Sequence, residues 1–198
     1  MRLLVPLVAH AGETGVDENG KIFDKTQELS LVTVTGPDGR RVLPVFTSTE
    51  AMSRWNPRAR PIPTDARRVA LAAVAEGTPL LVLDPVSPTE FAFRRAMLQA
   101  IAEGSPWHPP TEDPAIRQAF EAVIEGETAI VGIRLEQGDA RARLAGPEVV
   151  VVLELQAGLD NESLSGLLER VQSAWQQSAP IAAGVDSLAI RVVAATPN

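Results

Sequence analysis

Four prolines within eleven residues interrupt the chain near its middle, over residues 104–114, which read GSPWHPPTEDP. Proline lacks a backbone N–H and fixes φ, so neither a regular helix nor a central strand can continue through this segment. Proline- and glycine-rich stretches commonly separate domains. The sequence therefore predicts an N-terminal domain over residues 1–105, a C-terminal domain over residues 113–198, and a proline-rich connector over residues 104–114.

The composition is that of a folded globular protein. Of the 198 residues, 45% are hydrophobic and 22% are charged, which excludes disordered and fibrous classes. The apolar run over residues 149–153, like every other uninterrupted apolar run in the chain, is far shorter than the roughly 20 residues that a membrane-spanning helix needs. We expect a cytoplasmic protein without a membrane partner, in which the first residues form a strand rather than a signal peptide.

The counts of cysteine, histidine and charged residues exclude several kinds of chemistry. The chain has no cysteine and only two histidines, so disulfides and cysteine nucleophiles are excluded, and we predict no metal site. The net charge is -7, and residues 111–198 hold 13 acidic against 6 basic side chains. Nucleic-acid binding requires concentrated positive potential, so we expect no nucleic-acid partner.

Strands and helices alternate in the N-terminal part. Apolar, β-branched or turn-bounded patterns predict strands over residues 3–9, 29–35, 41–46 and 80–83. Capping residues and helical spacing predict helices over residues 48–55, 64–77 and 88–103. The glycine and proline residues at 36–39 predict a hairpin between the second and third strands. Thr64 is predicted to cap the second helix, and an extended segment over residues 58–63 precedes it.

The C-terminal part has a simpler order of elements. Helical spacing predicts helices over residues 113–125 and 161–178, and apolar patterns predict strands over residues 129–136, 148–155 and 188–194. The second of these strands is almost wholly apolar, so it is expected at the centre of its sheet. The predicted class is α/β (α+β), with a mixed-sheet N-terminal module followed by a smaller β-β-α-β module.

Residues 43–101 carry a resemblance to a known family. They begin with LPVFTSTEAMSRWNPRARPIP and end, after a helical pattern, with PLLVLDPVSPTEFAFRRAMLQAI. This segment resembles the SseB-like (enhanced serine sensitivity) family in its actinobacterial form. The resemblance implies an N-terminal SseB domain followed by a C-terminal SseB-like region. It implies a compact α/β module but names no reaction or substrate.

Common catalytic motifs are absent from the sequence, including GxGxxG, GxxxxGK[ST], GxSxG and HExxH. We therefore expect a non-catalytic protein that needs no cofactor and acts by binding an unknown protein partner or by self-association. The candidate surface joins residues that follow two predicted strands with nearby aromatic and charged side chains. It comprises Phe46, Thr47, Trp55, Arg58, Asp84, Glu90 and Arg94.

A cluster of arginines leaves an alternative open. Its members are Arg54, Arg58, Arg60, Arg67, Arg68, Arg94 and Arg95. Guanidinium groups pair well with carboxylates and phosphates, so the cluster favours a regulator that binds a small anionic ligand, or an enzyme of an unrecognised class. The simpler interpretation pairs these arginines with Glu50, Asp65 and Asp84 at the surface. Similarly, Ser87 or Thr89 is predicted to cap the helix over residues 88–103, with ligand binding at this strand end as the alternative.

Overall fold

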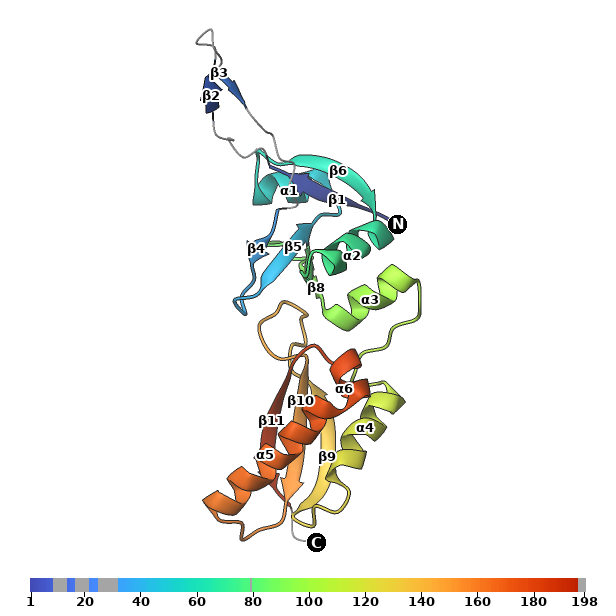
Figure 1. The fold of residues 1–198 in the computed structure, drawn as a ribbon, viewed down its shortest axis with the longest axis vertical. Helices are drawn as coiled ribbons and strands as arrows, with labels where there is room; N and C mark the ends of the chain where they lie inside the picture. Colours follow the sequence, from blue (N-terminus) through green and yellow to red (C-terminus); the bar gives the residue numbers. More distant parts are fainter. Residues whose placement is uncertain (9–13, 17–21, 25–31, 79, 196–198) are drawn as a thin grey trace. The chain divides into compact units, whose positions relative to one another are not determined.

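The computed structural model describes residues 1–8, 14–16, 22–24, 32–78 and 80–195. The chain divides into two compact units (Figure 1). Unit 1 comprises Met1–Arg94 and Ile101–Gly104, and unit 2 comprises Arg95–Ala100 and Ser105–Asn198. Helices alternate with strands along the chain, and the sheets contain both parallel and antiparallel pairs. This confirms the predicted α/β class.

Short strands form three sheets in the described part of unit 1. They are β1 (Arg2–Leu7), β2 (Thr14–Val16), β3 (Ile22–Asp24), β4 (Val34–Thr35), β5 (Arg41–Val45), β6 (Arg60–Asp65), β7 (Leu81–Leu83) and β8 (Phe91–Phe93). The largest sheet has the order β4-β5-β7-β8, in which only β5 and β7 are parallel. Two antiparallel pairs, β1-β6 and β2-β3, complete the set.

The first helices of unit 1 begin at capping residues. Helix α1 (Thr49–Trp55) follows Ser48, whose Oγ accepts a hydrogen bond from the Ala51 N–H at 3.1 Å. Helix α2 (Ala66–Ala75) is capped by Asp65, whose Oδ1 accepts from the Arg67 N–H at 3.0 Å. The predicted cap Thr64 is therefore wrong by one residue, because β6 continues through Asp65 before the backbone turns into the helix.

The predicted hairpin over residues 29–46 is confirmed as β4 and β5, with Gly39 at φ 80° in the turn. Residues 29–31 of its first strand lie outside the described residues. The helix predicted over residues 88–103 is wrong in its first half. Residues Phe91–Phe93 form β8 beside β7, and helix α3 (Arg95–Glu103) begins only afterwards. A short apolar run fits either structure, and pairing along β7 decides it here.

Unit 2 is one three-stranded sheet with helices on one face. Besides the first residues of α3, its elements are α4 (Pro114–Ile124), β9 (Ile130–Gln137), β10 (Val149–Leu155), α5 (Asn161–Gln177), α6 (Ala179–Gly184) and β11 (Leu188–Ala194). The sheet order is β11-β10-β9, so β10 is central as predicted. The sequence did not predict α6. One core joins the inward side chains of β10 to α4 and α5, with Phe120 and Trp175 at 0% and 1% exposure.

Candidate binding surface at the strand ends of unit 1

The parallel pair β5 and β7 brings two polar residues to the same edge of the unit 1 sheet. Thr47 lies two residues beyond the end of β5, and Asp84 follows β7 directly. The Asp84 N–H continues the ladder by donating to the Val45 carbonyl at 2.8 Å. The carboxyl ends of parallel strands are the usual place for ligand-binding groups in α/β sheets.

The Asp84 carboxylate is buried, with 1% of the residue exposed, and three donors surround it. The Thr47 N–H donates to Oδ1 at 2.8 Å, and the Thr47 hydroxyl donates to Oδ2 at 2.6 Å. The Thr89 hydroxyl also donates to Oδ2, at 3.2 Å. Burying a carboxylate is costly unless hydrogen bonds replace its water. Asp84 therefore fastens the β7–β8 loop to the end of β5.

The loop over residues 84–90 is held by its own polar groups. The Val86 N–H donates to Glu90 Oε2 at 2.6 Å, and the Thr89 N–H donates to Ser87 Oγ at 3.2 Å. Ser87 and Thr89 therefore do not cap a helix, since β8 follows the loop. These bonds hold two residues other than glycine at positive φ, Asp84 at 46° and Val86 at 58°.

Val86 is the unusual member of this loop. A β-branched residue at positive φ is an outlier, and such strain costs about 1–3 kcal/mol. Its side chain is nevertheless 78% exposed and contributes little to the core. The loop thus presents an aliphatic side chain to solvent on a backbone that is fixed in a strained conformation. The sequence analysis did not identify Val86 as a surface residue. Its position between two prolines of a loop could have indicated an exposed aliphatic side chain.

Aromatic packing supports the other half of the candidate surface. The rings of Phe46 and Trp55 lie 5.3 Å apart at 45°, and both pack with Met52 of α1. Phe46 is fully buried, whereas Trp55 is only half-buried. Arg58 follows in an exposed turn, where its N–H donates to Asn56 Oδ1 at 3.0 Å.

Burial divides the seven predicted surface residues into two groups. Phe46, Asp84 and Arg94 have exposures of 0%, 1% and 5%, so they cannot contact a partner directly. The prediction that these three residues contact a partner is therefore wrong, and they support the surface from below instead. The remaining four lie at least partly at the surface: Thr47, Trp55, Arg58 and Glu90. The structure joins Thr47 to Asp84 and Phe46 to Trp55.

The arginines of the predicted cluster have different roles. Arg67 donates to the carbonyls of Ala102 and Glu103 at 2.6 and 3.3 Å, at the carboxyl end of α3. Arg95 similarly donates to the carbonyls of Ala183 and Val185, at 3.2 and 3.0 Å, at the carboxyl end of α6. Cations are favourable at helix carboxyl ends because of the helix dipole. These two side chains are structural and are not available to a ligand.

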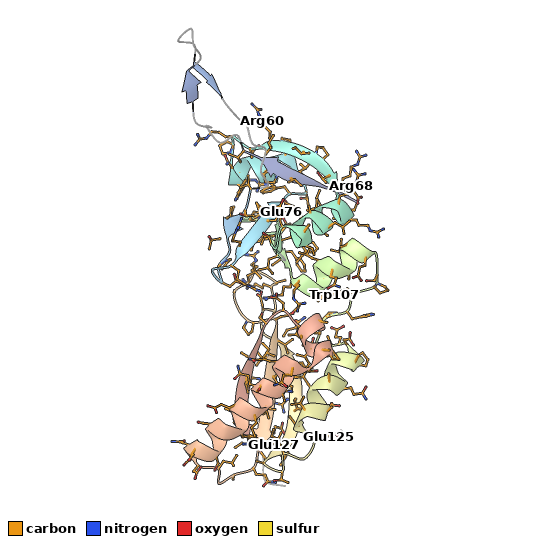
Figure 2. The ribbon with its side chains drawn as sticks, viewed as in Figure 1. Arg60, Arg68, Glu76, Trp107, Glu125 and Glu127 are labelled. Atoms are coloured by element: carbon orange, nitrogen blue, oxygen red, sulfur yellow. The ribbon has the colours of Figure 1, made fainter. Side chains whose placement is uncertain are left out.

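Of the three acidic residues predicted to pair with the arginines, only Glu50 interacts with the side chain of one of them, Arg54, within the described residues. Asp84 accepts from threonines, and Asp65 caps α2 and lies near the amino terminus. The pKa of Glu50 is lowered, first by a hydrogen bond from its own backbone N–H and then by Ser48, with Arg54 as the weakest cause. Within the described part of the chain, the guanidinium groups of Arg58, Arg60 and Arg68 make no hydrogen bond or ion pair. Figure 2 shows Arg60 on β6 and Arg68 on α2.

The described residues include no group of three or more histidine, aspartate or glutamate side chains placed to hold a metal ion. No helix in the same residues is long and apolar enough to cross a membrane. The hydroxyls of Thr47 and Thr89 already donate to Asp84, and the Glu90 carboxylate accepts from the Val86 N–H. The arrangement can therefore hold a shaped surface, and its exposed atoms can contact another molecule.

Comparison with known proteins identifies the N-terminal part. The family model for the SseB protein N-terminal domain matches residues 1–100. No curated protein matches the chain, and no solved structure matches it.

Proposed function

Because the chain belongs to the SseB family, we propose that it is a non-catalytic cytoplasmic protein that binds a protein partner through the exposed side of the strand-end surface. The contact residues are Trp55, Arg58 and Val86, and Phe46 and Asp84 support them from below. The actinobacterial type and a C-terminal SseB-like region over residues 113–198 are part of the same proposal.

The Asp84 network is the observation that carries this proposal. A general base or nucleophile must have a group free to reach the substrate. The Asp84 carboxylate has three internal donors and almost no exposure. The hydrogen bonds of this network stabilise the conformation of the loop, which includes the strained and exposed Val86. A rigid loop reduces the conformational entropy lost on association, which favours binding.

Affinity capture tests this proposal. The tagged full-length chain is used to isolate partners from an extract of its own cells, and mass spectrometry identifies them. We expect a partner that is lost with Val86→Asp and with Arg58→Ala. Arg141→Ala is the matched control, because Arg141 is an exposed arginine of unit 2. Retention of every captured protein by both unit 1 variants, with folding verified by thermal unfolding, would contradict the proposal.

The alternative function is binding of a small anionic ligand. It is favoured by the guanidinium groups of Arg58, Arg60 and Arg68, which have no partner among the described residues. A ligand that binds the native state raises the melting temperature by mass action. A screen of anionic metabolites should then give a rise that Arg58→Ala or Arg68→Ala removes. Arg94 is unsuitable for this test because it is buried.

A further inference from the structure

An apolar groove opens in unit 1 between β6 and α2, with a volume of about 130 Å³. Aliphatic side chains of β1, β6 and α2 line most of it, among them Val5, Ile62 and Val69, and Thr64 and Arg68 also line it. The register pairs Val5 with Ile62. Helix α2 buries Val69, whereas Ile62 remains 43% exposed. The helix therefore leaves part of the apolar face of the strand pair uncovered.

The volume of the groove limits what can occupy it. Pockets for small-molecule ligands usually measure about 300–1,000 Å³. A cavity of about 150 Å³ accommodates a group of the size of benzene. The groove therefore fits one aliphatic or aromatic side chain rather than a whole cofactor or metabolite.

The charge at the groove is positive and unpaired. Arg68 lines it, and its guanidinium makes no hydrogen bond or ion pair within the described residues. Side chains alternate along a strand, so Arg60 lies on the same face of β6 as Ile62. The neighbouring Arg67 differs, because it bonds to the carboxyl end of α3. A carboxylate beside an inserted apolar side chain would complement Arg68.

The edge of β6 excludes one common mode of peptide binding. The N–H and carbonyl of Leu4 both bond to Phe46, so they point away from β6. Leu4 lies opposite Pro63, and this pair therefore has no ladder hydrogen bonds between its members. The nitrogen of Pro63 consequently faces outward, as does that of Pro61 two residues earlier. Without these two N–H groups, the edge is unsuited to the addition of a partner strand.

We propose that the β6–α2 groove receives an aliphatic side chain from a segment of a protein partner, and that Arg68 binds an acidic residue next to that side chain. The proposal rests on the proposed function, since it names the chemistry of a protein partner. It uses residues other than Trp55, Arg58 and Val86. The partner contributes side chains to the groove and does not extend the sheet.

Selection from a displayed library of random peptides tests this inference with the immobilised full-length chain. Enriched peptides should share an aliphatic residue beside aspartate or glutamate. Fluorescence anisotropy of one enriched peptide should show binding at least about tenfold weaker for Arg68→Glu, as expected for loss of a charge-assisted hydrogen bond. A peptide with lysine in place of its acidic residue should bind the Arg68→Glu protein more tightly than it binds the wild-type protein.

Two variants serve as controls. Arg68→Glu should fold, because position 68 is the third residue of α2 and an acid is favourable there. Arg2→Glu makes the same charge change on β1, on the face opposite Val5, and should leave peptide binding unchanged within about twofold, the scatter expected for a distant exposed charge.

Four results would overturn the inference. They are no enrichment, enriched peptides without an acidic residue, binding that Arg68→Glu does not weaken, and a concentration-dependent dimer that Arg68→Glu abolishes. The last result would assign the groove to a second copy of the chain. If Val86→Asp still abolished partner capture in any of these cases, the proposed function would stand and only the groove assignment would fail.

Discussion

The open face of the unit 2 sheet and the β6–α2 groove of unit 1 arrange exposed charge in opposite ways. On the unit 2 sheet, Arg134 pairs with Glu154 and lies 3.9 Å from Glu136, which also accepts from Arg191. Arg134 and Arg191 flank Val152, which is fully buried on the face away from the helices. Long arginine stems can cover apolar surface in this way.

The groove also combines an aliphatic side chain with a nearby arginine, but neither is covered or paired. Ile62 is partly exposed, and Arg68 beside it has no partner within the described residues. A face whose charges already pair gains little from a partner, because a new contact must first break those pairs. A face with an uncovered aliphatic side chain and an unpaired cation can gain both apolar burial and a charge-assisted hydrogen bond. We therefore propose that unit 1 binds the partner and that unit 2 has a mainly structural role.

Trp175→Ala should have the largest effect on stability. Trp175 is 1% exposed, packs edge-to-face on Phe120 at 5.1 Å and donates to the Phe120 carbonyl at 3.3 Å. Its removal should lower the free energy of unfolding by about 3–5 kcal/mol, measured by urea denaturation. Peptide binding to unit 1 should not change under native conditions. Loss of that binding in the folded variant would contradict the division of roles.

Asp84→Ala should destabilise unit 1 by about 2–4 kcal/mol, because it removes three hydrogen bonds to a buried carboxylate. Thr47→Val is the matched comparison, since it keeps the side-chain shape and removes one of these hydrogen bonds, at a cost of about 1 kcal/mol. Urea denaturation of both variants measures the difference. Equal, small losses would show that the carboxylate does not hold the loop.

Val86→Gly separates stability from binding. Glycine adopts positive φ without strain, so the free energy of unfolding should rise by about 1 kcal/mol. The same change removes the exposed side chain, so partner capture should weaken. A variant that is more stable and still captures the partner fully would remove Val86 from the contact surface.

The smallest expected effect is that of Glu127→Gln in unit 2. Arg170 donates to both carboxylate oxygens of Glu127 at 3.1 Å, and this hydrogen bonding lowers the pKa of Glu127 from its usual 4.5. A lowered pKa in the folded state means that the pair stabilises the protein above pH 4.5. This contribution disappears as the pH falls through the lower folded value.

At pH 7 the loss should be about 0.5 kcal/mol, because the pair is largely exposed. Thermal unfolding of wild type and Glu127→Gln from pH 7 to pH 3 measures it, and the two curves should converge at the acidic end. Glu125→Gln is the control, since no ion pair of Glu125 exists among the described residues. Figure 2 labels Glu125 and Glu127. A difference that grows on acidification would contradict the stated sign.

Local signals in the sequence predicted most of unit 2. The apolar stripe of α5 and the limits of β11 depend on nearby residues, and the structure confirms both. Helix α6 was missed because the prediction ended at Ser178, although Pro180 suits the first turn of a new helix. In unit 1, residues 91–93 were predicted as part of a helix. They form β8 because they pair with β7, and their own sequence pattern does not reveal this pairing.

The candidate site could be predicted only in part. The positions of Thr47 and Asp84 after apolar strands indicated that they lie near a strand edge. The burial of Asp84 could not be predicted, because it depends on donors from Thr47, which is 37 residues away along the chain. For the same reason, the sequence could not separate Arg67, which bonds to α3, from Arg68, which lines the groove.

Site-specific photocrosslinking in living cells tests the central assignment most directly. A photoreactive aliphatic residue is placed at position 86 in unit 1 or, in a separate variant, at position 131 in unit 2, where Val131 is 50% exposed. We predict a crosslinked partner from position 86 and none from position 131. A partner crosslinked only from position 131, or equally from both positions, would contradict the assignment of binding to unit 1.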